Sequence, residues 1–180
     1  MSNRFQIWEK LGLINLPKFS SSWMKSHYAV PFADKIKGNI YNIYFCIRDQ
    51  KNRSNICSLK FNLNTKRVIQ KLSKIPLLTP GKLGTFDENG VTPSWIINTK
   101  KKKLIFYVGW NSSGNTRMSL FTGLGEIKNK KIRRYQDSPI LERSKIDPYL
   151  TATNCILYEN GIYKMWYVSG DGWTINKKKE

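Results

Sequence analysis

The feature that most constrains this chain is an apolar run that recurs about every sixty residues. The copies stand at 43–47, 104–108 and 163–168. Their flanks repeat as well, since 76–78 matches 139–141 and 92–97 matches 151–157. A pattern repeated at such a spacing indicates one supersecondary unit that has been copied several times. We therefore expect a chain built from structurally equivalent units.

Each unit consists of short β-branched and aromatic runs separated by turn residues, which predicts strands joined in hairpins. No stretch of useful length after Met24 has helical periodicity. The predicted strands lie near 27–33, 41–48, 55–62 and 66–72 in the first unit, near 92–98, 103–110, 116–123 and 131–135 in the second, and near 151–158 and 162–169 in the third. The chain is therefore predicted to be all-β.

Four strands in a unit is the composition of a propeller blade. We predict a five-bladed β-propeller type of fold with about two and a half to three blades present, in which strands pair only with their neighbours in sequence. The chain is then one partial domain over 1–180, divided into an N-terminal segment 1–26, blades at 27–75 and 76–136, and an incomplete blade at 137–180.

A propeller closes on itself because an open row of blades leaves strand edges unpaired. The predicted blades fall short of a ring, so we expect a fragment that self-associates or pairs with a missing C-terminal half. The alternative is that the third unit is a hairpin that caps a two-sheet sandwich.

The composition narrows the cofactors and the compartment. No apolar run is long enough for a membrane span, and the first residues lack the apolar core of a signal peptide, so we expect a cytoplasmic protein. Three widely spaced cysteines and one histidine argue against a disulfide framework and a zinc site, and we expect no cofactor. If strands 41–48 and 55–62 form a hairpin about Lys51 and Asn52, Cys46 and Cys57 lie directly opposite each other.

The formal net charge of +19 would ordinarily indicate a polyanionic partner. Much of the excess is lysine in tails and turns, at 100–103, 128–131 and 177–179. No RRM, KH, OB or helix-turn-helix pattern accompanies the charge, so nucleic-acid binding is disfavoured. Attraction to anionic glycans, sugar phosphates or membrane surfaces stays open.

Two carboxylates stand at equivalent places in the repeat. In a propeller, the loops before the first strands of the blades converge at one end of the central channel, and Asp87 and Asp147 precede Thr92 and Thr151 in such loops. Paired carboxylates are the minimal equipment for glycoside hydrolysis, so both are predicted to be catalytic. The alternative is that each closes an Asx-type turn.

A second group of residues suits sugar recognition, because a pyranose has apolar faces and polar edges. The ends of the second strands carry aromatic, amide and charged side chains, and His27 occupies the first-blade position that corresponds to the two aspartates. Core packing would also explain the tryptophans, and Arg48 either binds an anion or pairs with Asp49. The predicted substrate-binding set is His27, Arg48, Asp49, Trp110, Asn111 and Asn154.

Five segments carry a family resemblance: 8–14, 44–49, 84–91, 107–111 and 165–170. Together they resemble bacterial proteins of the five-bladed propeller glycosidase superfamily, the arabinanase, levansucrase and mannoside-phosphorylase group, and most closely members that accompany surface-polysaccharide synthesis. The resemblance implies acidic residues in the first three blades acting as base, pKa modulator and acid. Asp87 and Asp147 match the second and third, whereas His27 departs from the pattern at the first.

Two functions follow from these observations. The first is a glycosidase-like, carbohydrate-active protein, a hydrolase or sugar-transfer enzyme, with Asp87 and Asp147 around a sugar held by Trp110, Arg48 and Asn111. The second is a non-catalytic module that binds glycans or proteins and lacks the full acid set. The expected ligand in either case is a carbohydrate or a sugar phosphate.

Overall fold

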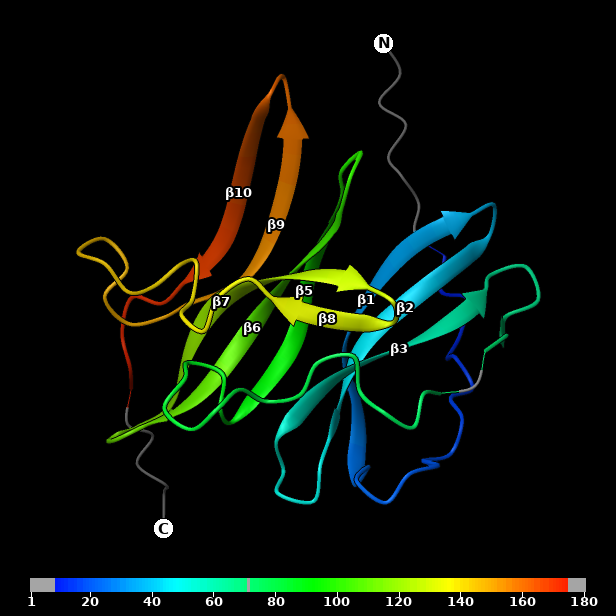
Figure 1. Cartoon of the computed structure of the whole chain (residues 1–180), viewed down its shortest axis with the longest axis horizontal. Coiled ribbons are helices and arrows are strands. Elements are labelled where there is room, and N and C mark those ends of the chain that lie inside the picture. Colours follow the sequence, from blue (N-terminus) through cyan, green and yellow to red (C-terminus); the bar gives the residue numbers. More distant parts are fainter. Residues whose placement is uncertain (1–8, 71, 175–180) are drawn as a thin grey trace.

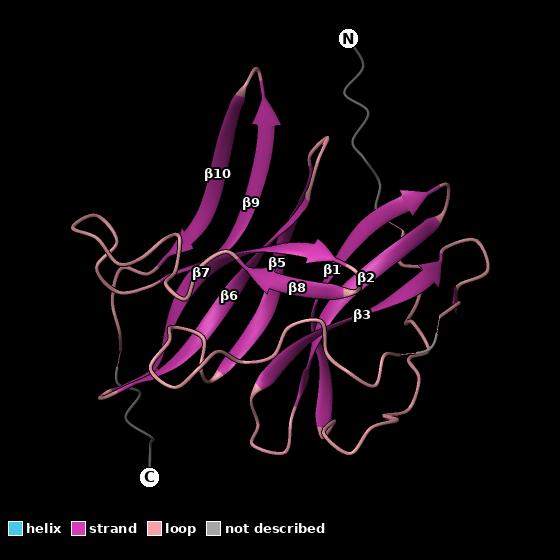
Figure 2. Ribbon diagram, viewed as in Figure 1, coloured by secondary structure: helices cyan, strands magenta, loops and turns pink. Residues whose placement is uncertain are grey.

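The computed structural model describes residues 9–70 and 72–174, and these residues form strands joined by loops and turns, with no helix among them (Figure 2). The predicted all-β class is therefore confirmed. Within these described ranges there is accordingly no helix long and apolar enough to cross a membrane.

The strands fall into two groups of four followed by a hairpin (Figure 1). The first unit contains β1 (Ser26–Lys37), β2 (Ile40–Arg48), β3 (Ser54–Asn62) and β4 (Arg67–Val68). The second unit contains β5 (Gly90–Asn98), β6 (Lys103–Ser113), β7 (Thr116–Lys128) and β8 (Lys131–Arg134). The terminal hairpin consists of β9 (Thr151–Glu159) and β10 (Ile162–Ser169). Within each group, successive strands pair antiparallel.

The two units are equivalent beyond their strand order. Ile56 on β3 exchanges backbone hydrogen bonds with the loop that follows the first unit, donating to Leu78 at 2.9 Å and accepting from Leu77 at 2.8 Å. Thr122 on β7 makes the same bridge in the second unit, donating to Leu141 at 3.4 Å and accepting from Ile140 at 2.8 Å. The predicted match between 76–78 and 139–141 is therefore confirmed.

One pairing departs from the prediction that only sequence neighbours pair. β3 and β5 meet in parallel through Ser54 and Gly90, which joins the first two units into one sheet path. Gly90 has φ of 153°, and a Cβ at this position would lie 3.0 Å from the backbone nitrogen of Ser54. Only glycine combines this backbone conformation with so close an approach between two strands.

The core lies on both faces of the hairpin formed by β2 and β3. On one face, Tyr44 and Ile56 pack with residues of the second unit, including Tyr107. On the other face, Phe45 and Cys57 pack with the segment that precedes β1. Side chains alternate between the faces along each strand, so both faces are apolar.

The predicted pairing of Cys46 with Cys57 is wrong by one residue. Cys57 faces Phe45, and Cys46 faces Ile56. The connecting loop is held by Asp49, whose carboxylate accepts from the backbone N–H groups of Lys51 and Arg53, both at 2.9 Å. A shift of one residue turns a side chain to the other face of a sheet, so the two cysteines point away from each other.

The terminal hairpin is the least covered part of the sheet structure. Among the described residues, β10 pairs only with β9, whereas β2 and β6 are paired on both sides. Tyr163 and Trp166 on β10 are 55% and 56% exposed. The third unit thus presents two strands and an open apolar face.

Candidate functional site

The first strands of the second and third units, β5 and β9, are each interrupted by a bulge. The β5–β6 register shifts between Pro93 and Trp95, which leaves Ser94 extra, and the β9–β10 register shifts so that Thr153 is extra. The two bulges are at equivalent positions in the repeat. Bulges bend a strand and redirect side chains, and they are common beside functional sites.

These bulges link the two strands through Asn154. The backbone N–H of Asn154 donates to Ser94 Oγ at 2.7 Å, and that hydroxyl donates to the Asn154 carbonyl at 3.1 Å. The indole N–H of Trp95 donates to the Ile156 carbonyl at 2.8 Å, which extends the contact along β9. The second unit and the hairpin are therefore joined by side chains from the bulged strands.

The side chain of Asn154 is buried and only half satisfied. Its Nδ2 donates to Thr122 Oγ1 at 3.3 Å, while its Oδ1 has no hydrogen-bond partner among the described residues. Leaving a buried amide oxygen unpaired costs free energy, about 1–3 kcal/mol. Such a group calls for an explanation, and a ligand hydroxyl or a water that donates to Oδ1 is the simplest one.

Trp110 and Asn111 lie where β6 runs toward its end, and both are half-buried. The Trp110 indole N–H points to Thr92 Oγ1 at 3.5 Å, the long limit for a hydrogen bond. Asn111 Nδ2 donates to the Thr85 carbonyl at 3.2 Å. Asn111 thereby tethers the loop before β5, and its amide is engaged in holding that loop.

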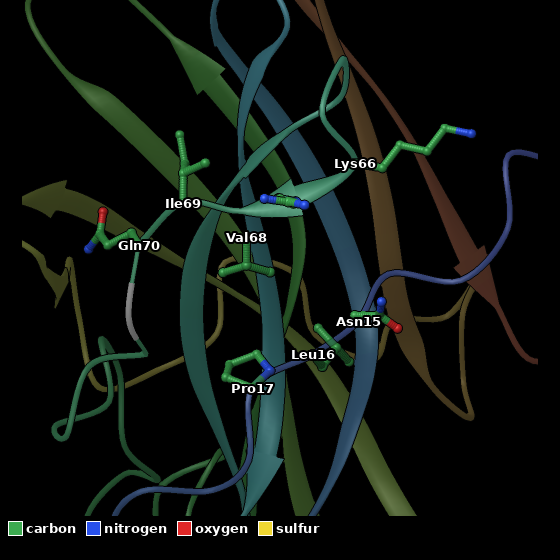
Figure 3. Close-up of a pocket in the computed structure, with 8 residues that line it drawn as sticks. Asn15, Leu16, Pro17, Lys66, Val68, Ile69 and Gln70 are labelled. Carbon is green, nitrogen blue, oxygen red and sulfur yellow. The ribbon is translucent and has the colours of Figure 1, made fainter.

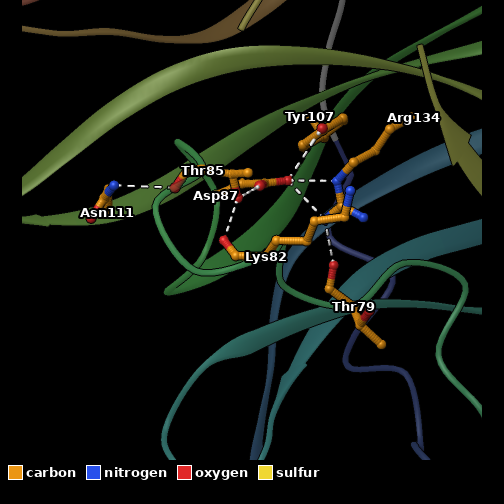
Figure 4. A network of polar contacts seen from close by, with 7 residues as sticks. All are labelled: Thr79, Lys82, Thr85, Asp87, Tyr107, Asn111 and Arg134. Atoms are coloured by element: carbon orange, nitrogen blue, oxygen red, sulfur yellow. Dashed lines mark hydrogen bonds and ion pairs between the residues drawn. The ribbon is translucent and has the colours of Figure 1, made fainter. Parts of the chain in front are cut away.

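Asp87 lies in a buried ion pair rather than in an open cavity (Figure 4). Its Oδ2 accepts from Arg134 Nε at 2.8 Å and Nη2 at 2.7 Å, and from the Tyr107 hydroxyl at 3.3 Å. Its Oδ1 accepts from Thr85 Oγ1 at 3.0 Å. Arg134 also donates to the Thr79 carbonyl at 2.6 Å. The Asp87 side chain is 1% exposed, so its charge is balanced by the guanidinium rather than by water.

Arg134 and Tyr107 are the residues at this site that the sequence reasoning missed. Arg134 stands 47 residues after Asp87, and no local pattern connects the two. Burial and the nearby Asp87 carboxylate raise the pKa of Tyr107, so its hydroxyl stays protonated and can donate.

Asp147 makes the equivalent contact in the third unit. Its Oδ2 accepts from the Tyr167 hydroxyl at 2.7 Å, and its backbone N–H donates to Ser144 Oγ at 3.1 Å. Hydrogen bonds from Ser169 and Tyr167 lower the pKa of the Asp147 carboxyl below its usual value of 3.8. Asp147 is therefore held in the ionised form.

The remaining predicted residues lie near the ends of β1 and β2. His27 is exposed, has φ of 67°, and its Nδ1 lies 2.7 Å from Ser26 Oγ. Arg48 is exposed and is the last residue of β2. Asp49 pairs with Arg53 at 3.0 Å rather than with Arg48. The structure thus gives Asp49 a loop-closing role and leaves the Arg48 side chain at the surface.

The described cavities lie away from these eight residues. The largest of them, about 470 Å³, is a groove between the segment at 15–17 and the turn and short strand at 66–70 (Figure 3). None of the five cavities found among the described residues has a predicted site residue in its lining. The catalytic and substrate-binding assignments made from the sequence therefore stay predictions.

The comparisons with known proteins give relatives in sequence and in fold. No family model matches the chain. It is 32% identical over 167 residues to two proteins of Mycobacterium tuberculosis, uncharacterized protein MT1551 of strain CDC 1551 and uncharacterized protein Rv1502 of strain H37Rv. The match covers 92% of this chain and 56% of each relative, so the chain spans little more than half their length.

Two solved structures share the fold. A glycoside hydrolase superimposes with a TM-score of 0.60 at 14% identity, over 81% of this chain and 49% of the hydrolase. A protein from a complex described by the words BT0996 and RGII superimposes with a TM-score of 0.63 at 15% identity, over 88% of this chain and 51% of that protein. This chain therefore has a glycosidase-like fold.

Proposed function

We propose that this chain is a glycan-binding protein built on part of a five-bladed propeller of the glycosidase superfamily, with a role in surface-polysaccharide metabolism. The single observation that carries the binding proposal is the unpaired Oδ1 of Asn154, buried between the bulged strands β5 and β9. A sugar hydroxyl that donates to this oxygen would satisfy it. The fold shared with a glycoside hydrolase supports the choice of carbohydrate as the ligand class.

Binding without hydrolysis is favoured by the state of Asp87. A glycosidase needs one carboxyl as acid and another as base or nucleophile, both able to reach the scissile bond. Asp87 is 1% exposed and is engaged by Arg134 through two nitrogens of the guanidinium. Releasing Asp87 toward a substrate would leave Arg134 without its partner, which is costly in a buried setting.

Hydrolysis or sugar transfer is the second candidate function, and one observation favours it. Asp87 and Asp147 lie at equivalent places in the repeat, and each accepts from a tyrosine twenty residues further on. The lowered pKa of Asp147 suits a base or a nucleophile, which must be ionised.

The experiment that tests binding is an array of bacterial surface-polysaccharide fragments, followed by calorimetric titration of the fragments that bind. We expect saturable binding that Asn154→Ala weakens about tenfold or more, because a buried hydrogen bond is lost. Asn115→Ala is the matched control, because Asn115 lies exposed in the turn between β6 and β7. Equal binding by the two variants, or no saturable binding by the wild type, would overturn the proposal. A thermal melt of each variant separates lost binding from lost folding.

The same fragments distinguish the two candidate functions. Incubation with wild type, Asp87→Asn and Asp147→Asn is followed by measurement of the reducing ends released. Binding without release by any of the three supports the glycan-binding function. Release by the wild type that both substitutions abolish would establish the hydrolase function instead.

A further inference from the structure

A cavity of about 250 Å³ lies between the first and second units, and it is lined mainly by polar and basic side chains. Its walls come from β2 and β3 on one side and from β6 and the β7–β8 turn on the other. The lining residues that matter here are Asn42, Tyr44, Ser58, Lys60, Lys103 and Lys130. The cavity is thus a seam where two repeats meet.

The charge of this cavity has one sign. Three lysines and no carboxylate contribute to its described lining. Lys103 is paired with Asp34, a buried carboxylate behind the cavity wall, and its ammonium lies 5.8 Å from the centre of the Tyr44 ring. Among the described residues, no ion pair is formed by Lys60 or Lys130. Two lysines therefore meet at a concave surface without a neutralising partner, which favours an anionic ligand.

The backbone at Lys130 is adapted to this position. Asn129 and Lys130 form the turn between β7 and β8 with φ of 50° and 58°. A two-residue turn of this kind requires positive φ at both central residues, and the second is usually glycine. Here lysine occupies it, so a side chain is retained at a backbone conformation that disfavours one.

Neutral donors stand beside the lysines. Burial above all, and also the Asp34 carboxylate, raise the pKa of Tyr44 to about 12, so its phenol keeps its proton. Ser58 and Asn42 add a hydroxyl and an amide to the same lining. Ammonium, hydroxyl and amide groups are the donors that protein sites use for phosphate and sulfate oxygens.

We propose that this inter-unit cavity is a binding site for a phosphate- or sulfate-type oxyanion, held by Lys60 and Lys130 with Lys103 and Tyr44 at its base. Its volume also accommodates a small group attached to the anion, such as the sugar of a phosphorylated monosaccharide. The site is separate from the proposed glycan site and does not rest on it: Lys103 begins β6, and Trp110 is seven residues further along that strand, about 23 Å away.

The test is calorimetric titration of the full chain with inorganic phosphate, then with glucose 1-phosphate and glucose. We expect saturable binding of both phosphates and none of glucose. Lys60→Ala and Lys130→Ala each remove one charge-assisted hydrogen bond, so each is expected to weaken binding about tenfold. Tyr44→Phe, which keeps the ring under Lys103, is expected to weaken binding less.

The matched control is the double variant Lys100→Ala/Lys101→Ala, which removes the same charge from the exposed β5–β6 turn as the double variant Lys60→Ala/Lys130→Ala removes from the cavity. Phosphate binding by the control within about twofold of wild type supports a defined site. Equal weakening by both double variants would show general attraction of a basic surface for anions, and would overturn the proposal. Absence of saturable phosphate binding by the wild type would overturn it as well.

Discussion

The hydroxyl of Tyr167 donates to the Asp147 carboxylate at 2.7 Å, and Tyr107 stands in the same relation to Asp87 at 3.3 Å. In each pair, the tyrosine on the second strand of a unit follows the aspartate of the preceding loop by twenty residues. The contact is therefore part of the repeated unit. It ties the loop before the first strand to the middle of its neighbour, whatever further role either carboxylate has.

The Tyr167 contact predicts a pH dependence of stability. Hydrogen bonds from Ser169 and Tyr167 lower the pKa of Asp147 in the folded state, so its contribution is present above the usual pKa of 3.8 and is lost as the pH falls through the lowered value. Tyr167→Phe should reduce the free energy of unfolding above this range, and its difference from wild type should shrink toward low pH.

Urea unfolding between about pH 2 and 7 measures this difference. Tyr163→Phe is the control, since Tyr163 lies exposed on the same strand and stacks only on the ring of Tyr158. A difference between Tyr167→Phe and wild type that stays constant over the whole pH range would contradict the role of Asp147.

The buried pair of Arg134 and Asp87 predicts a large stability effect. Arg134→Ala leaves the Asp87 charge uncompensated at 1% exposure, and breaking a buried pair in this way costs about 3–5 kcal/mol. Arg134→Lys should restore part of the loss, because an ammonium balances the charge without reproducing the two-nitrogen contact. Urea unfolding checks both variants. Arg133→Ala, at an exposed neighbouring position, should change the unfolding free energy by less than about 0.5 kcal/mol.

The repeat and the strands could be predicted because their signals are local. Apolar runs and turn residues located all ten strands, although β4 is only two residues long where 66–72 was predicted. The predicted equivalence of Asp87 and Asp147 is also present in the structure, as their tyrosine contacts show. The signal for those tyrosines was available, since the same twenty-residue spacing occurs in both units.

The partners of the site residues could not be predicted, because they come from distant parts of the chain. The Arg134 that neutralises Asp87 is 47 residues away, and the Asp34 that pairs with Lys103 is 69 residues away. Whether a carboxylate faces solvent or a guanidinium depends on such contacts. The sequence therefore indicated where the aspartates stand in the repeat, and tertiary packing determined their surroundings.

Close packing beneath the Asp87 loop predicts that two glycines cannot be replaced. A Cβ at Gly109 would lie 2.7 Å from Asp87 Cβ, and one at Gly123 would lie 2.7 Å from Phe86 Cζ. Gly109→Ala and Gly123→Ala should each destabilise the chain by about 1–3 kcal/mol through overpacking. Gly172→Ala is the control, since nothing lies within 4 Å of its Cβ position. Thermal melts that rank the three variants equally would contradict this account of the loop.

The cysteines provide a test of the β2–β3 register. Burial raises the pKa of Cys46, and burial together with the nearby Cys46 raises the pKa of Cys57 to about 12, so neither thiol is a reactive thiolate near neutral pH. Cys155 is only half-buried. A thiol reagent at about pH 8 should therefore modify one cysteine per chain in the folded state.

All three cysteines should react after unfolding in guanidinium chloride, and Cys155→Ser should abolish the reaction of the folded chain. Mild oxidation should leave Cys46 and Cys57 unlinked, because the observed register places them on opposite faces of the hairpin. A disulfide between Cys46 and Cys57, detected by peptide mass spectrometry of the folded and oxidised chain, would show instead that the two cysteines lie directly opposite, and the one-residue correction to the hairpin would be wrong.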